Sequence, residues 1–384
     1  MSRLEELIQQ HCPNGVEYKK IKEVYQRIKG TPITAGKMKE IQCPDGEIRI
    51  FAGGKTVIDA NEADIPNANI TRVPAVLVQS RGVIDAIYYD KPFTFKNEMW
   101  AYTHKEQTSV KFLYYVMKQN IQHFRDAASG MGALPQISLG TTEDFVIPVP
   151  PLPVQEEIVR ILDNFAELQA ELQAELQKRL QQYEYYRDKL LSFSDLSNWG
   201  GQEVSVEWKK LGDVCNLGTG SHNTQDGLSE GRYPFYTRGS EVLYLNDYDY
   251  DETAIITAGD GAGVGKVFHF VKGKYALHQR AYRIVPDEKK VLARFVYYYI
   301  GATFYDYIMR NSVSSSVASI RRPMMVNYPI PVPSLEEQQR IVDILDNFYT
   351  LTADLTAGLP AEIEARRKQY EYYRDQLLTF KQKA

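Results

Sequence analysis

One stretch of the sequence occurs twice, and this repeat constrains the fold more than any other feature of the chain. Residues 147–165 read IPVPPLPVQEEIVRILDNF and residues 330–348 read IPVPSLEEQQRIVDILDNF, with 13 identities in 19 positions. Residues 182–193 and 369–380, which both begin QYEYYRD, are identical at 10 of 12 positions. A repeat of this length indicates that the chain contains two copies of one structural unit.

Each copy predicts a long helix that starts after a proline-rich lead. Because the residue before a proline is driven away from helical geometry, the segment 147–153 marks the start of the first helix. Beyond it, apolar residues recur every three or four positions from Val154 to Phe193, and again from Ile341 to Phe380. This spacing places them on one stripe of a helix. A helix of about 40 residues is roughly 60 Å long, which is typical of a coiled coil. We expect the two helices to pack as an antiparallel coiled coil.

The second copy is longer than the first. Ile147 corresponds to Ile330 at the start of the repeat, whereas Gln182 corresponds to Gln369 near its end, so the offset grows by four between these points. The added residues make about one helical turn and lie near Gly358-Leu359-Pro360. Because proline inside a helix removes a hydrogen bond and clashes with the preceding turn, we expect a kink or a short break there.

The segments 1–150 and 201–333 differ in character from the helices and repeat each other more weakly. Short strand-like runs separated by turns fill the first segment, after a short amphipathic helix over 1–12. A helical stretch is expected over 110–126. VEYKKI and KFLYYV in the first segment have the counterparts VEWKKL and RFVYYY in the second, and Ile137 corresponds to Ile320.

The loops between these matching strings do not repeat. TAGKMKE at 34–40 corresponds to GTGSHNTQ at 218–225, and QSRG at 79–82 corresponds to AGDG at 258–261. A shared framework with different loops is the pattern expected of two related domains that each recognise a different target. The predicted fold class is α+β, with two similar mixed α/β globular domains, 1–150 and 201–333, and an internal pseudo-two-fold repeat. Two long spacer helices, 151–200 and 334–384, separate them.

The composition excludes several classes of protein. Three isolated cysteines and six scattered histidines show no spacing typical of a zinc site. We find no signal peptide and no run of 18 apolar residues, so a cytoplasmic protein without a membrane span is expected. The net charge is −4, but the acidic excess lies in the helical segments. The two globular segments are balanced, so each can carry a local basic face.

Catalytic and nucleotide-binding motifs are missing from the sequence. It contains no [DNS]-P-P-[YFW] string of the kind an adenine methyltransferase needs. GGKT at 53–56 lacks the first glycine of a P-loop, and GAGVGK at 261–266 has the wrong spacing. We interpret both glycine runs as turns, and we expect no catalysis, cofactor or metal in this chain.

The order of these segments resembles the specificity (S) subunit of a Type I restriction-modification system. The strings QEEIVRILDNF and QYEYYRDKLL are similar to the repeats of that family, and the resemblance spans the whole chain. It implies a non-catalytic subunit whose two target-recognition domains each bind one half of a bipartite double-stranded DNA target. It also implies that the helices set the unread gap and dock two modification (methyltransferase) subunits, with restriction subunits in the full complex. S-adenosylmethionine, ATP and magnesium are then expected only in the partner subunits.

Residues that could contact DNA are polar side chains at loop positions, because base edges are read mainly by Arg, Lys, Asn and Gln. A lone charged residue is more often simply solvated. Arg81 stands out because Gly82 allows close backbone approach, and so do Gln279 and Arg280 beside His278. The full set of candidates is Lys37, Lys39, Lys55, Gln79, Arg81, Lys96, Asn97 and Gln136 in the first segment, and His222, Asn223, Arg238, Lys266, His278, Gln279, Arg280, Arg321 and Arg322 in the second.

The tyrosine-rich strings of the helices divide into two groups. Tyr183, Tyr186, Tyr370 and Tyr373 fall on the apolar stripe, so we expect them to pack against the partner helix. Tyr185 and Tyr372 fall off the stripe. Because exposed aromatic residues often anchor a partner protein, this pair is the candidate for partner binding.

Two other functions remain open at this point. One is an enzyme of DNA metabolism with an unrecognised site, which the missing motifs disfavour. The other is a coiled-coil adaptor without a nucleic-acid role, which does not explain why loops diverge on a repeated framework.

Overall fold

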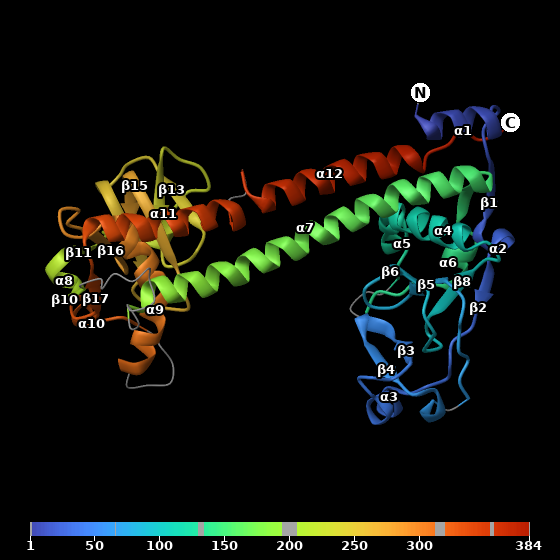
Figure 1. Cartoon of the computed structure of the whole chain (residues 1–384), viewed down its shortest axis with the longest axis horizontal. Helices are drawn as coiled ribbons and strands as arrows, with labels where there is room; N and C mark the ends of the chain where they lie inside the picture. The colour runs from blue at the N-terminus through green and yellow to red at the C-terminus, as the bar shows by residue number, and fades with distance from the viewer. Residues whose placement is uncertain are drawn as a thin grey trace. The chain divides into compact units, whose positions relative to one another are not determined.

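The computed structural model describes residues 2–65, 67–129, 134–193, 206–311, 319–353 and 357–383, except for the side chain of Lys55. The chain forms two compact units. The first comprises Met1–Leu172 and Ile363–Ala384, and the second comprises Gln173–Glu362. The longest helix, α7 (Leu152–Ser192), has 41 residues and continues from the first unit into the second (Figure 1).

The described residues of the first unit form three sheets, with the strand orders β2-β8-β5-β6, β4-β3-β7 and β1-β9. Its strands are β1 (Glu17–Lys20), β2 (Gln26–Ile28), β3 (Ile48–Phe51), β4 (Val57–Ala60), β5 (Ala75–Gln79), β6 (Asp85–Tyr89), β7 (Phe93–Phe95), β8 (Trp100–Thr103) and β9 (Val146–Val149). Its helices besides α7 and α12 are α1 (Arg3–His11), α2 (Ile21–Val24), α3 (Ala35–Ile41), α4 (Gln107–Gln119), α5 (Ile121–Asp126) and α6 (Leu139–Glu143), with 3-10 turns η1 (Gly53–Lys55) and η2 (Glu62–Asp64).

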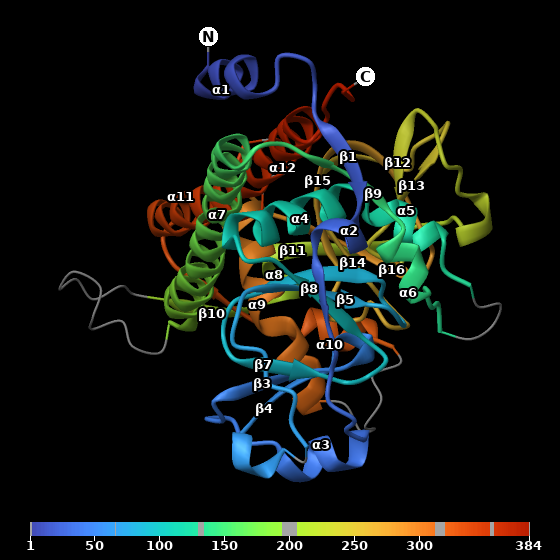
Figure 2. The ribbon, with the colours of Figure 1, turned by 90° about the vertical axis from the view of Figure 1, so that its right-hand side faces the viewer.

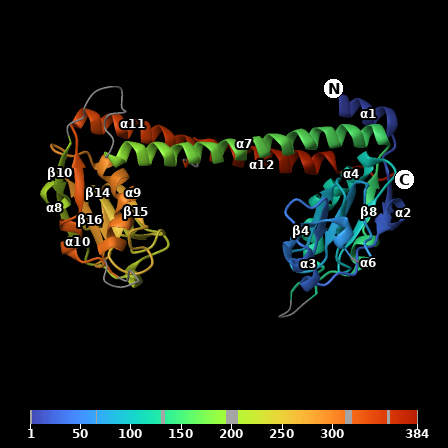
Figure 3. The same ribbon diagram turned by 60° about the horizontal axis from the view of Figure 1, so that its bottom comes forward.

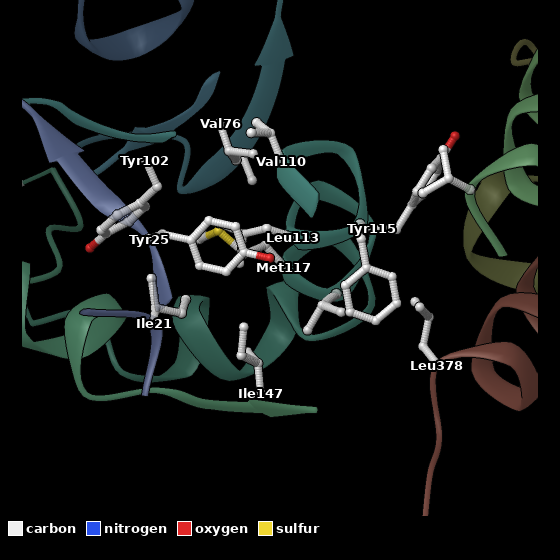
Figure 4. Close-up of a cluster of buried hydrophobic side chains, with 14 of the residues drawn as sticks. Ile21, Tyr25, Val76, Tyr102, Val110, Leu113, Tyr115, Met117, Ile147 and Leu378 are labelled. Atoms are coloured by element: carbon white, nitrogen blue, oxygen red, sulfur yellow. The ribbon is translucent and has the colours of Figure 1, made fainter. Parts of the chain in front are cut away.

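Helix α4 joins the main sheet of the first unit to α7. It packs on β5 and β6 on one side and faces α7 on the other (Figure 3). The strand β5 (AVLVQ) is buried along its whole length, which suits its β-branched and aliphatic residues. Figure 4 shows Val76 of β5 and Leu113 of α4 in one apolar cluster that also includes Leu378. The sheet β4-β3-β7 and α3 lie at the end of this domain away from α7 (Figure 2).

The second unit gathers its strands differently. One six-stranded sheet has the order β11-β16-β14-β15-β12-β13, beside the pair β10-β17. The strands are β10 (Glu207–Lys210), β11 (Cys215–Thr219), β12 (Tyr233–Tyr236), β13 (Val242–Leu245), β14 (Tyr250–Ala258), β15 (Phe268–Leu277), β16 (Ala281–Pro286) and β17 (Pro329–Val332). The helices are α8 (Leu211–Val214), α9 (Ala293–Asn311), α10 (Arg322–Val326) and α11 (Leu335–Thr352), with the 3-10 turn η4 (Thr224–Asp226); the last helix, α12 (Leu359–Leu377), continues into the first unit.

The proline-rich leads of the two repeats form the same small sheet in each unit. Pro148 pairs with Tyr18 in the antiparallel pair β1-β9, and Pro331 pairs with Trp208 in β10-β17. Each pair anchors the start of its long helix to the start of the preceding domain. The leads are extended as far as Val149 and Val332, as expected, and the weak repeat of the globular segments is structural. The expected start of the first helix after residue 153 is wrong, because α7 begins at Leu152 and Pro153 lies in its first turn, where a missing N–H costs no intrahelical bond.

The long helices pack antiparallel, as expected. In the first unit, Phe165 of α7 lies 5.7 Å from Tyr373 and 6.3 Å from Tyr370, measured between ring centroids. The earlier part of α7 packs in the same cluster as the later Leu378, so the chain directions are opposed. In the second unit, Phe348 of α11 lies 5.7 Å from Tyr186 in the corresponding arrangement. The stripe tyrosines therefore pack against the partner helix, as predicted.

The second repeat is broken close to Pro360. Helix α11 ends at Thr352 and α12 begins at Leu359, so the expected break is confirmed. Pro360 is the second residue of α12, where no intrahelical partner for its missing N–H is required. A side chain on Gly358 would place its Cβ 2.2 Å from the Thr350 carbonyl oxygen, so glycine allows the chain to turn tightly here.

The helix expected over 110–126 is a pair of helices. α4 ends at Gln119 and α5 begins at Ile121. The side-chain amide of Asn120 donates to the Val116 carbonyl at 2.8 Å, and such local bonding by Asn competes with helix continuation.

Candidate nucleic-acid interface

Each unit fixes its globular domain on a long helix through one aspartate, which we call the helix clamp. In the first unit, the Lys111 ammonium lies 2.7 Å from Asp163 Oδ2, and the Tyr115 hydroxyl donates to Asp163 Oδ1 at 2.5 Å. Burial, together with the adjacent carboxylate, raises the pKa of Tyr115. The phenol therefore stays protonated and remains a donor.

The same clamp occurs in the second unit, at the corresponding positions of the repeat. Arg294 Nε donates to Asp346 Oδ1 at 2.7 Å, and the Tyr298 hydroxyl donates to the same oxygen. Burial again raises the pKa of the tyrosine. The clamps show that the two domains attach to the helices through equivalent residues, although both donors share one carboxylate oxygen in the second unit and bind separate oxygens in the first.

In the first domain, several of the sequence candidates meet where β5 ends and β8 begins. Arg81 forms an antiparallel bridge with Gln136, and both side chains are exposed. Lys96 Nζ lies 3.0 Å from Glu98 Oε1, and the carbonyl of Glu98 accepts a hydrogen bond from the Ser80 hydroxyl. The loops that carry Arg81, Lys96 and Gln136 thus lie next to one another and form one loop cluster.

The other candidates of the first domain differ in exposure and in the elements on which they lie. Asn97 is exposed next to Lys96, whereas Gln79 is buried in β5. Lys37 and Lys39 lie on α3, where Lys37 pairs with Glu40 at 2.8 Å. Lys55 ends the turn η1, and its side chain lies outside the described part of the structure.

In the second domain, two short segments pair through His222 and His278, which form a parallel bridge. The backbone N–H of Gln279 donates to the His222 carbonyl at 2.9 Å, and the Gln279 side chain donates to the Asn223 amide oxygen. Asn223 and Gln279 are exposed, while the His278 ring is buried. Two of the candidate amides are therefore held side by side at the surface.

Arg238, Asp260 and Arg280 form a second cluster in this domain, which we call the arginine fork. Arg238 Nη1 donates to Asp260 Oδ1 at 2.8 Å, and Arg280 Nη1 donates to Asp260 Oδ2 at 3.0 Å. Burial alone would raise the pKa of Asp260, but the two guanidinium groups outweigh it and hold that pKa below its usual value. The carboxylate is therefore ionised at neutral pH.

The remaining candidates make contacts of other kinds. Lys266 Nζ lies 5.3 Å from the ring centroid of Tyr305 in α9. Arg322 donates to the Leu217 carbonyl at 3.1 Å, and Arg321 precedes α10 as its N-cap residue.

Sequence reasoning missed the carboxylates of both clusters. Glu98 and Asp260 hold the basic side chains, and Asp249 lies 3.3 Å from His222 Nε2. A search for base-reading residues favours cations and amides, so it overlooks the acidic residues that position them. The signal that could have found Asp260 is the charge change between QSRG and AGDG at equivalent positions.

The off-stripe tyrosines are the most exposed aromatic residues of the described helices. Tyr185 on α7 is 60% exposed and Tyr372 on α12 is 63% exposed. Their neighbours Tyr186 and Tyr373 stack on Phe348 and Phe165, respectively. The two exposed rings thus occupy equivalent positions of the repeated string QYEYYRD.

Sites of two other kinds are missing from the described residues. No group of His, Cys, Asp and Glu residues in this part of the chain has the geometry to hold a metal ion. Among the helices that the structure describes, none is long and apolar enough to cross a membrane.

Comparison with known proteins places these features in one family. Residues 13–182 and 203–365 match the Type I restriction modification DNA specificity domain. The specificity subunit of the EcoR124I/EcoR124II Type I restriction enzyme of Escherichia coli is 38% identical over 301 residues, 71% of this chain and 72% of that protein. A putative Type I restriction enzyme specificity subunit of Haemophilus influenzae is 32% identical over 313 residues, 74% of this chain and 77% of that protein.

Solved structures have the same fold. The crystal structure of the S subunit of the Type I restriction-modification system from M. genitalium aligns with a TM-score of 0.62. That alignment has 17% identity and covers 94% of this chain and 95% of that chain. The chain therefore belongs to the specificity subunits of Type I restriction-modification systems. It is the DNA specificity subunit and a non-catalytic part of a complex with other subunits.

Proposed function

We propose that this chain selects a bipartite DNA target, with one globular domain reading each half. In this proposal, residues 1–150 and 201–333 are the two target-recognition domains, and 151–200 and 334–384 are the spacer segments. Double-stranded DNA binds to the loop clusters around Arg81 in the first domain and around Arg280 in the second.

The observation that supports this proposal most strongly is a contrast within the repeat. The helix clamps and the proline-rich strand pairs recur at equivalent residues in both units. The charged side chains of the loop clusters do not recur, because Arg81 in the first domain corresponds to Asp260 in the second. A repeated framework that carries different polar loops suits two domains that read different base sequences.

The long helices are proposed to set the unread gap between the half-sites. α7 is a continuous helix of 41 residues, about 60 Å at 1.5 Å per residue. Half-site spacing is a geometric consequence when two reading domains are joined by a rigid element.

The repeat also predicts which partners bind. Tyr185 and Tyr372 occupy equivalent, exposed positions, so each is proposed to anchor one of two modification subunits. Restriction subunits complete the full complex. S-adenosylmethionine, ATP and magnesium are proposed to bind in the partner subunits, consistent with a non-catalytic specificity subunit.

A selection experiment tests this function. The chain is co-purified with its modification subunit and incubated with a pool of random DNA, and the bound DNA is sequenced. We expect enrichment of two short motifs separated by a gap of fixed length. Enrichment of a single continuous motif, or of none, would contradict the proposal. In a parallel arm, the purified chain alone should transfer no methyl group from S-adenosylmethionine to DNA.

A further inference from the structure

The arginine fork leaves one edge of a guanidinium group accessible. Arg280 uses Nη1 to bind Asp260, and none of its bonds to described residues uses the Nε and Nη2 edge. Its side chain is 63% exposed, compared with 39% for Arg238 and 22% for Asp260. The Asp260 carboxylate is thus less exposed than either arginine side chain, and its hydrogen bond holds the Arg280 side chain in a defined orientation.

The backbone of Arg280 is fixed from both sides. Its N–H donates to His278 Nδ1 at 3.0 Å, and its carbonyl accepts from the Gly259 N–H at 2.8 Å. The buried His278 is held neutral because burial lowers its pKa, so Nδ1 can accept this bond. Little backbone freedom therefore remains to be lost at Arg280 when its side chain binds a ligand.

The tight backbone here requires two glycines, Gly259 and Gly263, in the loop AGDGAG at 258–263. A Cβ on Gly259 would lie 2.5 Å from the Arg280 carbonyl oxygen, and a Cβ on Gly263 would lie 2.3 Å from the Arg238 carbonyl oxygen. The loop therefore approaches the backbone of both arginines closely, and this approach places Asp260 between them.

The first domain has the same backbone arrangement with the charges exchanged. The N–H of Ile137 donates to the Ser80 carbonyl at 2.9 Å, and the N–H of Ile320 donates to the Gly259 carbonyl at 2.7 Å. Ser80 therefore corresponds to Gly259, and the next residue is Arg81 in one domain and Asp260 in the other.

The facing strand shows the reverse exchange. The Glu98 carbonyl accepts from the Ser80 hydroxyl, as the Arg280 carbonyl accepts from the Gly259 N–H. Glu98 therefore corresponds to Arg280. Each domain keeps an arginine and a carboxylate at these two positions, but on opposite strands. Such a reversal on an unchanged framework is expected at positions that determine specificity.

From this geometry, and resting on the proposed DNA-binding function, we infer that Arg280 reads a guanine in the second half-site and that Asp260 positions it. A planar guanidinium edge with two parallel N–H groups matches the N7 and O6 acceptors of guanine in the major groove, the commonest specific contact of arginine with a base. Asp260 touches no base and acts only through Arg280 and Arg238. Because Asp260 orients the Arg280 guanidinium, that group has the orientation needed to bind guanine before the DNA arrives.

The test uses the full chain with its modification subunits and compares Arg280→Ala, Arg280→Lys and Asp260→Asn. Binding is measured by competition with oligonucleotides in which each base pair of the second half-site is varied in turn. Lys289→Ala, which removes one positive charge from an exposed turn of the same domain, is the control for charge. Thermal unfolding of every variant is measured in parallel.

We expect Arg280→Ala to reduce discrimination at one G·C pair by roughly 5- to 150-fold and to leave the first half-site unchanged. Arg280→Lys keeps the charge but not the planar fork, so it should lose the same discrimination. Asp260→Asn should weaken discrimination at that same pair with little change in melting temperature, and Asp260→Glu should restore part of it.

A uniform loss of affinity at all base pairs, with the salt dependence reduced by about one ion, would show a phosphate contact and overturn the inference. Unchanged discrimination in Arg280→Ala would overturn it as well. Failure of the wild-type complex to select any bipartite sequence is a different result, because it would contradict the proposed function itself.

Discussion

The two globular domains agree where they hold the helices and differ where their loop clusters lie. At the helix clamp, Lys111 and Tyr115 bind Asp163 as Arg294 and Tyr298 bind Asp346. Even the side-chain chemistry is kept, with only lysine exchanged for arginine. This agreement indicates that the attachment of domain to helix tolerates little variation.

At the loop clusters the two domains keep the backbone and reverse the charges. Arg81 and Glu98 in the first domain correspond to Asp260 and Arg280 in the second. The sheets differ too, since the first domain divides its strands between separate sheets of four and three and the second has one sheet of six. Variation is thus concentrated away from the clamp.

The largest effect is expected at two glycines, one in each domain, that lie close to a backbone carbonyl. A Cβ on Gly30 would lie 2.2 Å from the Phe95 carbonyl oxygen, and a Cβ on Gly220 would lie 1.8 Å from the Leu277 carbonyl oxygen. Because backbone cannot move aside easily, Gly30→Ala and Gly220→Ala should each cost about 3 kcal/mol or more. Thermal unfolding should show melting temperatures lowered by roughly 6–12 °C.

Two other glycines provide matched controls for these variants. A Cβ on Gly36 of α3 would meet only the Thr34 hydroxyl oxygen, at 4.0 Å, and a Cβ on Gly301 of α9 would point into open space. Alanine favours helix over glycine by about 1 kcal/mol, so Gly36→Ala and Gly301→Ala should leave stability unchanged or raised. Equal losses in all four variants would break the argument from close backbone approach.

The helix clamps should respond alike to the same substitution. Asp163→Asn and Asp346→Asn weaken two charge-assisted hydrogen bonds each, and partial exposure reduces the cost to about 1–2 kcal/mol. Melting temperatures should fall by roughly 2–8 °C in both. Asp188→Asn, in an exposed pair with Arg187, is the control and should have little effect. A loss in only one of the two clamp variants would contradict their equivalence.

Inserting LQAE after Glu175 tests whether the helices act as a spacer common to both domains. Four residues add about one turn, close to 6 Å, and roughly keep the apolar stripe. We expect methylation mapping to show the unread gap lengthened by one or two base pairs, at about 3.4 Å each, with both half-sites unchanged. Inserting only Leu-Gln there turns the stripe by about 200° and should abolish activity. A fully active LQAE variant with an unaltered gap would disprove the spacer role.

The smallest expected effect is a pH dependence of the stability of the second domain. Burial lowers the pKa of His269, although the Gly239 carbonyl partly opposes this shift. The unfolded chain then binds the proton more readily than the folded chain, so stability is full above about pH 6.5 and falls as the pH drops toward the folded pKa. Melting curves from pH 8 to pH 5 should show this decline, and His269→Gln should flatten it. An unchanged slope in the variant would rule out His269 as the cause.

The repeat made much of the framework predictable from the sequence. Helical periodicity is a local property of the chain, so the long helices, their antiparallel packing and the break near Pro360 could be inferred. The strand-like runs of the first segment were also predictable, and β5 is one of them. The split between α4 and α5 could not be inferred, because it depends on one side-chain bond of Asn120.

The candidate site was less predictable because it depends on strand pairing. Asp260 binds Arg238 and Arg280, which lie 22 and 20 residues away in sequence, and only the sheet brings them together. Gln79 illustrates the opposite case. Its polar side chain beside Arg81 predicts a loop position, but it ends a strand that is buried throughout.

Exchange of one domain tests the central claim, that each domain reads its own half of the target. Residues 201–333 are replaced by the corresponding domain of another specificity subunit, with α7, α11 and α12 retained, and the methylated sequences are mapped with the same modification subunits. We predict that one half-site changes to that of the donor, while the other half-site and the gap stay the same. A change in both half-sites would contradict independent reading by the two domains.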